Sequence, residues 1–220
     1  MSLDNSAIAD LAWTTPAQSD DLVGGSSVFW GVKRVFDIGV SLLLLPVMLF
    51  FALLLLVLNP FQNRGPLVFR QKRMGRDGKP FLAIKFRSML PADEITRGAN
   101  DPIETHRITA LGQVIRKTRI DELPQVINVL RGEMSLIGPR PDAFSHAQEY
   151  LELIPEYRAR HTVRPGISGL AQVTLGYAEG IDATRAKAIS DIAYIRNAGV
   201  LMDMRIIWLT LVTIVMRRGY

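Results

Sequence analysis

An acidic pair among basic residues is the part of this sequence best suited to chemistry. Asp121 and Glu122 are surrounded in the chain by cationic side chains, namely Arg116, Lys117, Arg119 and Arg140. Carboxylates placed among guanidinium groups suit phosphate chemistry, because the cations bind the anionic substrate while an acid binds a metal ion or attacks phosphorus. The pattern therefore indicates a phosphoryl-transfer site with Asp121 and Glu122 at its centre.

The same pair also fits a structural role at the start of a helix. Apolar residues recur after it at helical spacing: Leu123, Val126, Ile127 and Leu130. Gly132 would end this helix, and Pro124 falls in its first turn, where proline is tolerated. Acidic residues at such a position commonly cap backbone N–H groups and stabilise the positive end of the helix dipole. The sequence leaves both roles open.

Composition limits the other kinds of site. The chain has 220 residues, a formal net charge of +5 and 48% hydrophobic residues, which fits one domain or one domain with appendages. It contains no cysteine, so a disulfide framework is excluded and a reducing cytoplasm is permitted. The three histidines, His106, His146 and His161, lack the spacing of metal ligands, which argues against structural zinc or a histidine-based triad.

Residues 38–58 form an apolar run, preceded by a polar leader over residues 1–30. As a helix the run would be about 31 Å long, enough to cross a bilayer. Pro46 lies inside it and would kink or break the helix. Basic residues flank both ends, and the positive-inside rule places both groups on the cytoplasmic side. These features favour a re-entrant helix–break–helix over residues 31–60, with a single kinked span as the alternative.

Residues 61–220 are then expected to form a cytoplasmic catalytic domain. Residues 67–88 read as a hairpin that turns at Gly75–Gly78 and carries Lys85 and Arg87 in its second arm. Helical patterns cover residues 108–117, 142–161, with a bend at Pro155, and 182–197, the last read as a capped helix. The predicted fold is therefore α/β, more narrowly a helix-rich α+β domain.

Two further segments bear on function. Residues 164–169 predict a tight glycine loop that brings backbone N–H groups close to another group. The apolar run 206–216 is too short to span a bilayer and predicts an amphipathic interfacial helix or a core helix. Such a helix beside the re-entrant element would make the domain monotopic and membrane-anchored.

Four motifs taken together resemble the bacterial sugar transferases, the monotopic polyprenyl-phosphate phosphoglycosyl transferases. They are Lys85–Met89, Asp121–Gln125, Gly132–Pro141 and Arg164–Leu170. The similarity covers roughly residues 31–216 and is greatest to the small members that contain only the catalytic core. After Gln172 the chain departs from the Asn-Gly-Arg-like segment of many members.

The resemblance implies a reaction. A sugar-1-phosphate would pass from a UDP-sugar to undecaprenyl phosphate with release of UMP, as the first membrane step of exopolysaccharide, capsule, O-antigen or glycoconjugate assembly. Asp121 matches the family nucleophile that forms a covalent phosphosugar intermediate, and Glu122 matches its partner; both are expected to bind Mg²⁺. We expect neighbouring cations to keep Asp121 ionised.

The resemblance also implies roles for other residues. Lys85, Arg116 and Arg140 match family basic residues around the phosphates. We expect Arg87, Arg119 and Arg164 to bind substrate phosphates as well. Asp203 matches an acid near the site, and Pro46 matches the proline that breaks the re-entrant helix. The expected location is the bacterial inner membrane, with the catalytic domain on its cytoplasmic face.

A different class of function stays open on the residues alone. A non-catalytic membrane adaptor could bind anionic lipid through the basic residues between 64 and 87. Nucleic-acid binding is not expected, because the basic residues are not interleaved with aromatic ones. Apolar membrane surfaces would permit a homo-oligomer, and the sugar and the pathway are not specified by the sequence.

Overall fold

The computed structural model describes residues 22–91, 104–175 and 180–216. The α-helices of this part are α2 (Ser27–Gln62), α3 (Ala110–Lys117), α4 (Gln125–Leu130), α5 (Phe144–Leu153), α6 (Leu170–Thr174), α7 (Ile181–Arg196) and α8 (Val200–Val215). The 3₁₀ turns are η1 (Arg76–Gly78), η2 (Thr105–Arg107), η3 (Ile120–Glu122) and η4 (Pro155–His161). The strands are β1 (Val68–Met74), β2 (Pro80–Phe86), β3 (Ser135–Ile137) and β4 (Gly166–Ser168). This is the helix-rich α+β fold that the sequence predicts.

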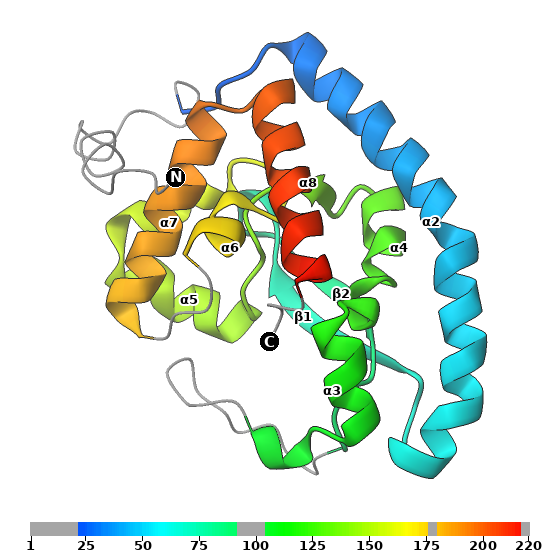
Figure 1. Ribbon diagram of the computed structural model, residues 1–220. Helices are drawn as coiled ribbons and strands as arrows, with labels where there is room; N and C mark the ends of the chain where they lie inside the picture. The colour runs from blue at the N-terminus through cyan, green and yellow to red at the C-terminus, as the bar shows by residue number, and fades with distance from the viewer. Residues whose placement is uncertain (1–21, 92–103, 176–179, 217–220) are drawn as a thin grey trace.

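The hairpin forms as predicted. Strands β1 and β2 pair antiparallel, with Val68 opposite Phe86 and Met74 opposite Pro80. The turn is possible because Asp77 and Gly78 adopt the left-handed conformation, with φ of 57° and 72°. Figure 1 shows the hairpin in the middle of the molecule, between α2 on one side and α5 and α7 on the other.

Helix α2 differs from the prediction at Pro46. The expected break is absent: the helix is continuous from Ser27 to Gln62 and contains both Pro46 and Pro60. It changes direction along its length as it follows one side of the molecule (Figure 1). Proline removes one N–H donor, and a long apolar helix tolerates this loss by bending. The helix also starts inside the predicted leader, of which residues 1–21 lie outside the described part.

Most side chains of α2 are uncovered although they are apolar. The helix is long and apolar enough to cross a bilayer, and only 11% of its apolar window is buried in the protein. Leu43, Phe50 and Phe61 are among the large exposed side chains. Apolar surface of this extent marks contact with a membrane or another protein, and the length and composition favour membrane association.

Polar contacts fix the N-terminal half of α2 to the rest of the domain. Lys33 forms a buried ion pair with Asp203 of α8, with 2.6 Å between Nζ and Oδ2. Asp37 accepts a hydrogen bond from Ser135 Oγ at 2.7 Å and one from the backbone N–H of Leu136 at 3.2 Å. Buried charges require such partners, so these contacts set the position of α2 beside β3 and α8.

The glycine-rich segment after Arg164 is a short strand rather than a loop. β4 pairs in parallel with β3, and the Gly166 N–H donates to the Pro139 carbonyl at 2.9 Å. A Cβ added at Gly166 would lie 2.2 Å from the Gly138 nitrogen, so only glycine fits this crossing. The expected close backbone approach is therefore present, within a parallel pair.

The remaining helices follow the predicted pattern with two differences. The segment 142–161 divides at Ile154 into α5 and the 3₁₀ turn η4, which begins at Pro155. Helix α7 begins at Ile181 after Gly180 and has no side-chain cap. In α8, Ile206 is fully buried whereas Leu201 and Trp208 are 87% and 66% exposed, so α8 is amphipathic as predicted.

Candidate active site

Asp121 and Glu122 lie in the tight turn η3, between α3 and α4. The turn is entered through Arg119, which has the left-handed φ of 59° that non-glycine residues rarely adopt. The N-terminus of α4 has no side-chain cap, and Pro124 occupies the cap position. The capping role is therefore excluded for the pair. Both side chains of the pair are nevertheless buried.

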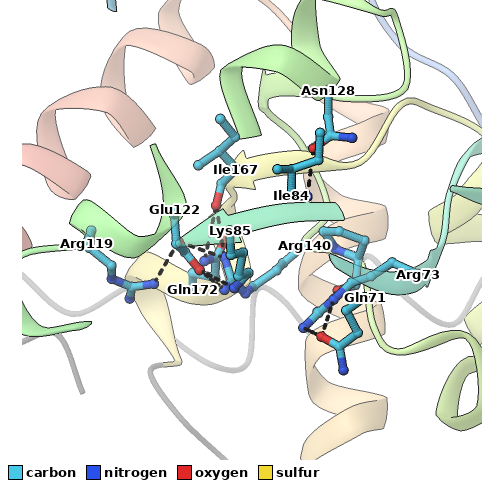
Figure 2. Close-up of polar contacts among 11 residues, drawn as sticks. Gln71, Arg73, Ile84, Lys85, Arg119, Glu122, Asn128, Arg140, Ile167 and Gln172 are labelled. Carbon is cyan, nitrogen blue, oxygen red and sulfur yellow. Dashed lines mark hydrogen bonds and ion pairs between the residues drawn. The ribbon is translucent and has the colours of Figure 1, made fainter. Parts of the chain in front are cut away.

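Glu122 is the acceptor for three cationic side chains, which Figure 2 shows converging on its carboxylate. Lys85 Nζ lies 2.8 Å from Oε1, Arg119 Nη1 lies 3.3 Å from Oε2, and Arg140 contacts both oxygens. Burial alone would raise the pKa of Glu122, but Arg140 and Lys85 outweigh it and hold the pKa well below its usual range. Glu122 is thus a fixed anion that gathers cations.

Asp121 differs from Glu122 in its hydrogen bonding and in the direction of its pKa shift. Its side chain is buried, and its Oδ1 has no hydrogen-bond partner. Burial and the adjacent Glu122 raise the pKa of Asp121 to about 6, and Lys85, Arg116 and Arg140 oppose this rise. At neutral pH Asp121 is therefore mainly ionised, as expected, although its pKa is raised rather than lowered. The cations pair with Glu122, and Asp121 Oδ1 stays without a partner.

Lys85 reaches the site from β2. Its ammonium is desolvated, which lowers its pKa to about 8 although Glu122 acts in the opposite direction. The strand is held against α4 by Asn128, whose Oδ1 accepts from the Ile84 N–H at 3.0 Å and whose Nδ2 donates to the Leu82 carbonyl at 2.8 Å. Asn128 therefore fixes the position of β2, and with it the position of Lys85 relative to Glu122. Sequence reasoning missed this residue, although a polar side chain within an otherwise apolar helix was a usable signal.

Arg73 is a second residue that the sequence analysis did not assign to the site. It follows Gln71 on the same face of β1, and its guanidinium donates to Gln71 Oε1 (Figure 2). The same guanidinium donates to the Pro141 carbonyl. Burial and Arg140 lower its pKa to about 10. We had grouped it with basic residues at the membrane surface, but it adds positive charge beside Lys85 and Arg140.

Arg140 is held by a buried network behind it. Arg160 donates from Nη2 to the Arg140 carbonyl at 2.7 Å, and its guanidinium also pairs with Asp142 and Asp191. The Arg140 side chain donates to the Ile167 carbonyl of β4 at 3.2 Å as well as to Glu122. A guanidinium fixed on both sides is preorganised for a phosphate group.

The other residues assigned from sequence lie at different distances from this cluster. Arg116 is half-buried in α3 and acts electrostatically on Asp121. Arg87 instead donates to the Pro66 carbonyl and lies over the Phe69 ring. Arg164 donates to the Gly132 carbonyl, beyond the C-terminal end of α4, and Asp203 pairs with Lys33. The structure thus brings Lys85, Arg119 and Arg140 to the pair, and places Arg87, Arg164 and Asp203 elsewhere.

The donor set allows a partial fit for a divalent cation. Among the described residues no group of three or more His, Cys, Asp or Glu side chains could hold a metal ion. Mg²⁺ commonly binds through one or two carboxylates together with substrate phosphates, so a single free oxygen can suffice. The unpaired Oδ1 of Asp121 fits this requirement. Glu122 fits less well, because cationic side chains occupy both of its oxygens.

Comparison with known proteins gives one consistent result. A family model described as bacterial sugar transferase matches residues 28–217. A UDP-N-acetylgalactosamine-undecaprenyl-phosphate N-acetylgalactosaminephosphotransferase of Aeromonas hydrophila is 42% identical over 189 residues, which cover 86% of this chain and 45% of the relative. A UDP-glucose:undecaprenyl-phosphate glucose-1-phosphate transferase of Klebsiella pneumoniae is 40% identical, covering 89% of this chain and 42% of the relative. The chain therefore spans less than half the length of these two relatives.

A third relative has nearly the same extent as this chain. The exopolysaccharide production protein PSS of Rhizobium leguminosarum bv. phaseoli is 41% identical over 188 residues, covering 83% of this chain and 94% of the relative. The region that the family model matches, residues 28–217, contains the turn with Asp121 and Glu122, the hairpin with Lys85 and the segment with Arg140.

Proposed function

The chain belongs to the bacterial sugar transferase family, and from this premise we propose that it transfers a sugar-1-phosphate from a UDP-sugar to undecaprenyl phosphate. The products would be undecaprenyl-diphosphate-sugar and UMP. Relatives at about 40% identity carry names for this activity with different sugars, so the proposal is made for the reaction and not for one sugar. It rests mainly on one observation, the buried Asp121 with an unpaired oxygen beside a cation-bound Glu122.

The reaction would proceed in two displacements at the same phosphorus. A carboxylate oxygen of Asp121 attacks the β-phosphorus of the UDP-sugar. The bond from this phosphorus to the bridging oxygen breaks, and UMP leaves with the electron pair. An oxygen of undecaprenyl phosphate then attacks the phosphosugar on Asp121, and the aspartyl oxygen leaves as a carboxylate. Each step exchanges one P–O bond for another, which is why no redox group is needed.

The cations around Glu122 would bind the phosphates in both steps. Lys85, Arg119 and Arg140 carry three positive charges against the two carboxylates of the pair. The remaining positive charge attracts a diphosphate, and preorganised donors stabilise the negative charge that develops in the transition state. Glu122 would keep these donors in place between turnovers.

Mg²⁺ would be held by Asp121 together with phosphate oxygens of the donor. When bound, it would neutralise diphosphate charge that otherwise repels the attacking carboxylate. The unpaired Oδ1 of Asp121 supports this assignment.

The membrane would supply the acceptor. We propose that α2 enters the cytoplasmic leaflet of the bacterial inner membrane and, through its change of direction rather than a break, returns to the same face, since basic residues flank both ends of its apolar run, residues 38–58. The polyprenyl chain then stays in lipid while its phosphate reaches the domain surface. The amphipathic α8 would lie at the interface beside it.

Identification of the released nucleotide tests the proposal. We expect UMP from at least one member of a UDP-sugar panel in the presence of undecaprenyl phosphate. Release of UDP would point to an ordinary glycosyl transferase. A non-catalytic basic adaptor would bind anionic vesicles in a salt-dependent way and release no nucleotide with any donor.

A further inference from the structure

A basic cavity lies away from Asp121, between the N-terminal half of α2 and the turn of the hairpin. It has a volume of about 440 Å³. Arg34 lines the cavity, and its guanidinium donates to the carbonyls of Val129 and Leu130. The cavity therefore lies beside the C-terminal end of α4. Glu122 precedes the opposite end of the same helix. The two sites are therefore separated by the length of α4.

Positive charge is in excess in this cavity. Its wall contains Lys33, Arg34, Arg76 and Arg164, against the single lining carboxylate of Asp37. The charge of Lys33 is balanced by its buried ion pair with Asp203. Three guanidinium groups then face one carboxylate, and burial together with Arg34 and Arg76 lowers the pKa of Arg164. The arginines repel one another unless an anion lies between them.

The arginines come from three separate parts of the chain and are only partly engaged by the protein. Arg164 uses Nε for the Gly132 carbonyl at 2.9 Å. Arg76 is 54% exposed, and its 3.6 Å contact with Asp77 is a surface pair of little strength. Each guanidinium has five N–H donors in a planar fork that matches phosphate oxygens. Donors therefore remain on at least these two arginines for a ligand.

The rest of the lining contains apolar and aromatic side chains, including Val23, Trp30, Ile137 and Val163, together with the hydroxyl groups of Ser27, Ser135 and Thr162. The cavity therefore combines a cationic side with an apolar side, as ligand sites commonly do. A phosphorylated molecule with a small apolar part has this character, either as a soluble compound or as a phospholipid whose headgroup enters beside α2.

We propose that this cavity is a second anion site, which binds the phosphoryl group of such a ligand independently of the Asp121 site. Arg76 and Arg164 contact the phosphoryl oxygens, and Trp30 lies against the apolar part. The site does not depend on the transferase activity proposed above, because it shares no side chain with the Glu122 cluster.

Trp30 allows the cavity to be monitored directly. The other two tryptophans, Trp13 and Trp208, can be replaced by phenylalanine in the full chain held in neutral detergent micelles. Trp30 fluorescence is then titrated with inorganic phosphate and, separately, with dihexanoylphosphatidylglycerol. A response to phosphate identifies a soluble source of the ligand, and a response to the lipid alone identifies a headgroup.

The deciding variant is Arg76→Gln, with Arg70→Gln as the matched control, an exposed arginine of the same hairpin outside the cavity. We expect saturable binding of at least one probe, weakened about tenfold by Arg76→Gln through loss of a charged hydrogen bond. Arg70→Gln should leave the affinity unchanged. The proposal is overturned if Trp30 responds to neither probe, or if the two substitutions weaken binding equally.

Discussion

Glu122 shows how a single carboxylate can organise a cationic site. Lys85, Arg119 and Arg140 reach it from three separate segments of the chain, and all four side chains are at least partly buried. An unpaired buried charge is costly, so the removal of the shared anion affects every cation around it. Asp121, in contrast, has an oxygen that nothing in the described structure satisfies.

The substitution Glu122→Gln tests this organising role. We expect the rate of UMP release to fall at least about 100-fold and the free energy of unfolding to fall by about 3 kcal/mol, because the cations lose their common partner. Both quantities should be measured on the same preparation, by nucleotide release and by denaturant unfolding. Glu149→Gln, at an exposed position of α5, is the control. Normal activity in Glu122→Gln would contradict the role.

His161 gives a pH dependence that is separate from catalysis. Burial and Arg160 lower its pKa to about 4, and its Nε2 has no hydrogen-bond partner. In the unfolded chain His161 binds a proton near pH 6.5, so the stability that its neutral form contributes to the fold is fully present above that pH. It is lost as the pH falls toward 4, by about 3 kcal/mol at most.

The comparison of two variants isolates this effect from other titrating groups. Between pH 7.5 and 4.5, His161→Gln should lose less unfolding free energy than the wild type. His106→Gln, at an exposed position, should behave as the wild type does. Denaturant unfolding at the two pH values measures both. Parallel losses in all three proteins would show that His161 titrates normally.

At the scale of elements, the crossing of β3 and β4 supports Arg140. The Gly138 N–H donates to the Ser168 carbonyl at 2.9 Å, so the segment before Arg140 is joined to the strand whose Ile167 carbonyl accepts from it. A Cβ at Gly166 would overlap Gly138 backbone atoms, with 2.2 Å to the nitrogen. Backbone atoms cannot move aside as a flexible side chain can.

Gly166→Ala should therefore destabilise the protein by about 2 kcal/mol or more and reduce activity through displacement of Arg140. Thermal unfolding and UMP release measure the two effects. Gly31→Ala is a suitable control, because a Cβ at Gly31 of α2 meets no atom within 4 Å. If both variants unfold at the same temperature, the backbones of Gly138 and Gly166 are not as close as the structure indicates.

Elements with strong local patterns were predictable. The hairpin has alternating residues around a glycine turn, and α3 and α4 have a helical apolar face, so each is encoded within its own segment. Strands β3 and β4 were missed because each has three residues and finds its partner about thirty positions away. No local period signals such a pair.

The structure brings the predicted site residues Asp121, Glu122, Lys85 and Arg140 together, and their catalytic and binding roles stay predictions. The family resemblance identified three motifs that contain these residues: Lys85–Met89, Asp121–Gln125 and Gly132–Pro141. Arg73 and Asn128 were missed because their roles depend on which strand face meets which helix. Motif matching alone also grouped Arg164 with these residues, whereas the fold places it at the other end of α4.

At the scale of the whole molecule, α2 decides how the domain meets the membrane. Its N-terminal half is fixed by Lys33 and Asp37, while much of its remaining surface is apolar and uncovered. The helix passes Pro46 without a break and changes direction along its length (Figure 1). A helix that enters and returns predicts that the leader and the catalytic domain lie on the same side.

Cysteine labelling distinguishes return from crossing, and the absence of native cysteine makes each introduced thiol unique. We expect Ser19→Cys, in the leader, and Glu149→Cys, in the domain, to react with a membrane-impermeant maleimide only after the inner membrane is permeabilised. Reaction of Ser19→Cys alone in intact spheroplasts would establish a single span and refute the re-entrant arrangement.

The most direct measurement for the whole account is the intact mass of the protein after incubation with a UDP-sugar and Mg²⁺ in the absence of undecaprenyl phosphate. We predict a covalent gain of one sugar phosphate at Asp121, one equivalent of UMP, and transfer of the adduct when the lipid phosphate is added. Asp121→Asn should show none of these. Formation of lipid-linked sugar by an enzyme whose Asp121 never becomes modified would contradict the account.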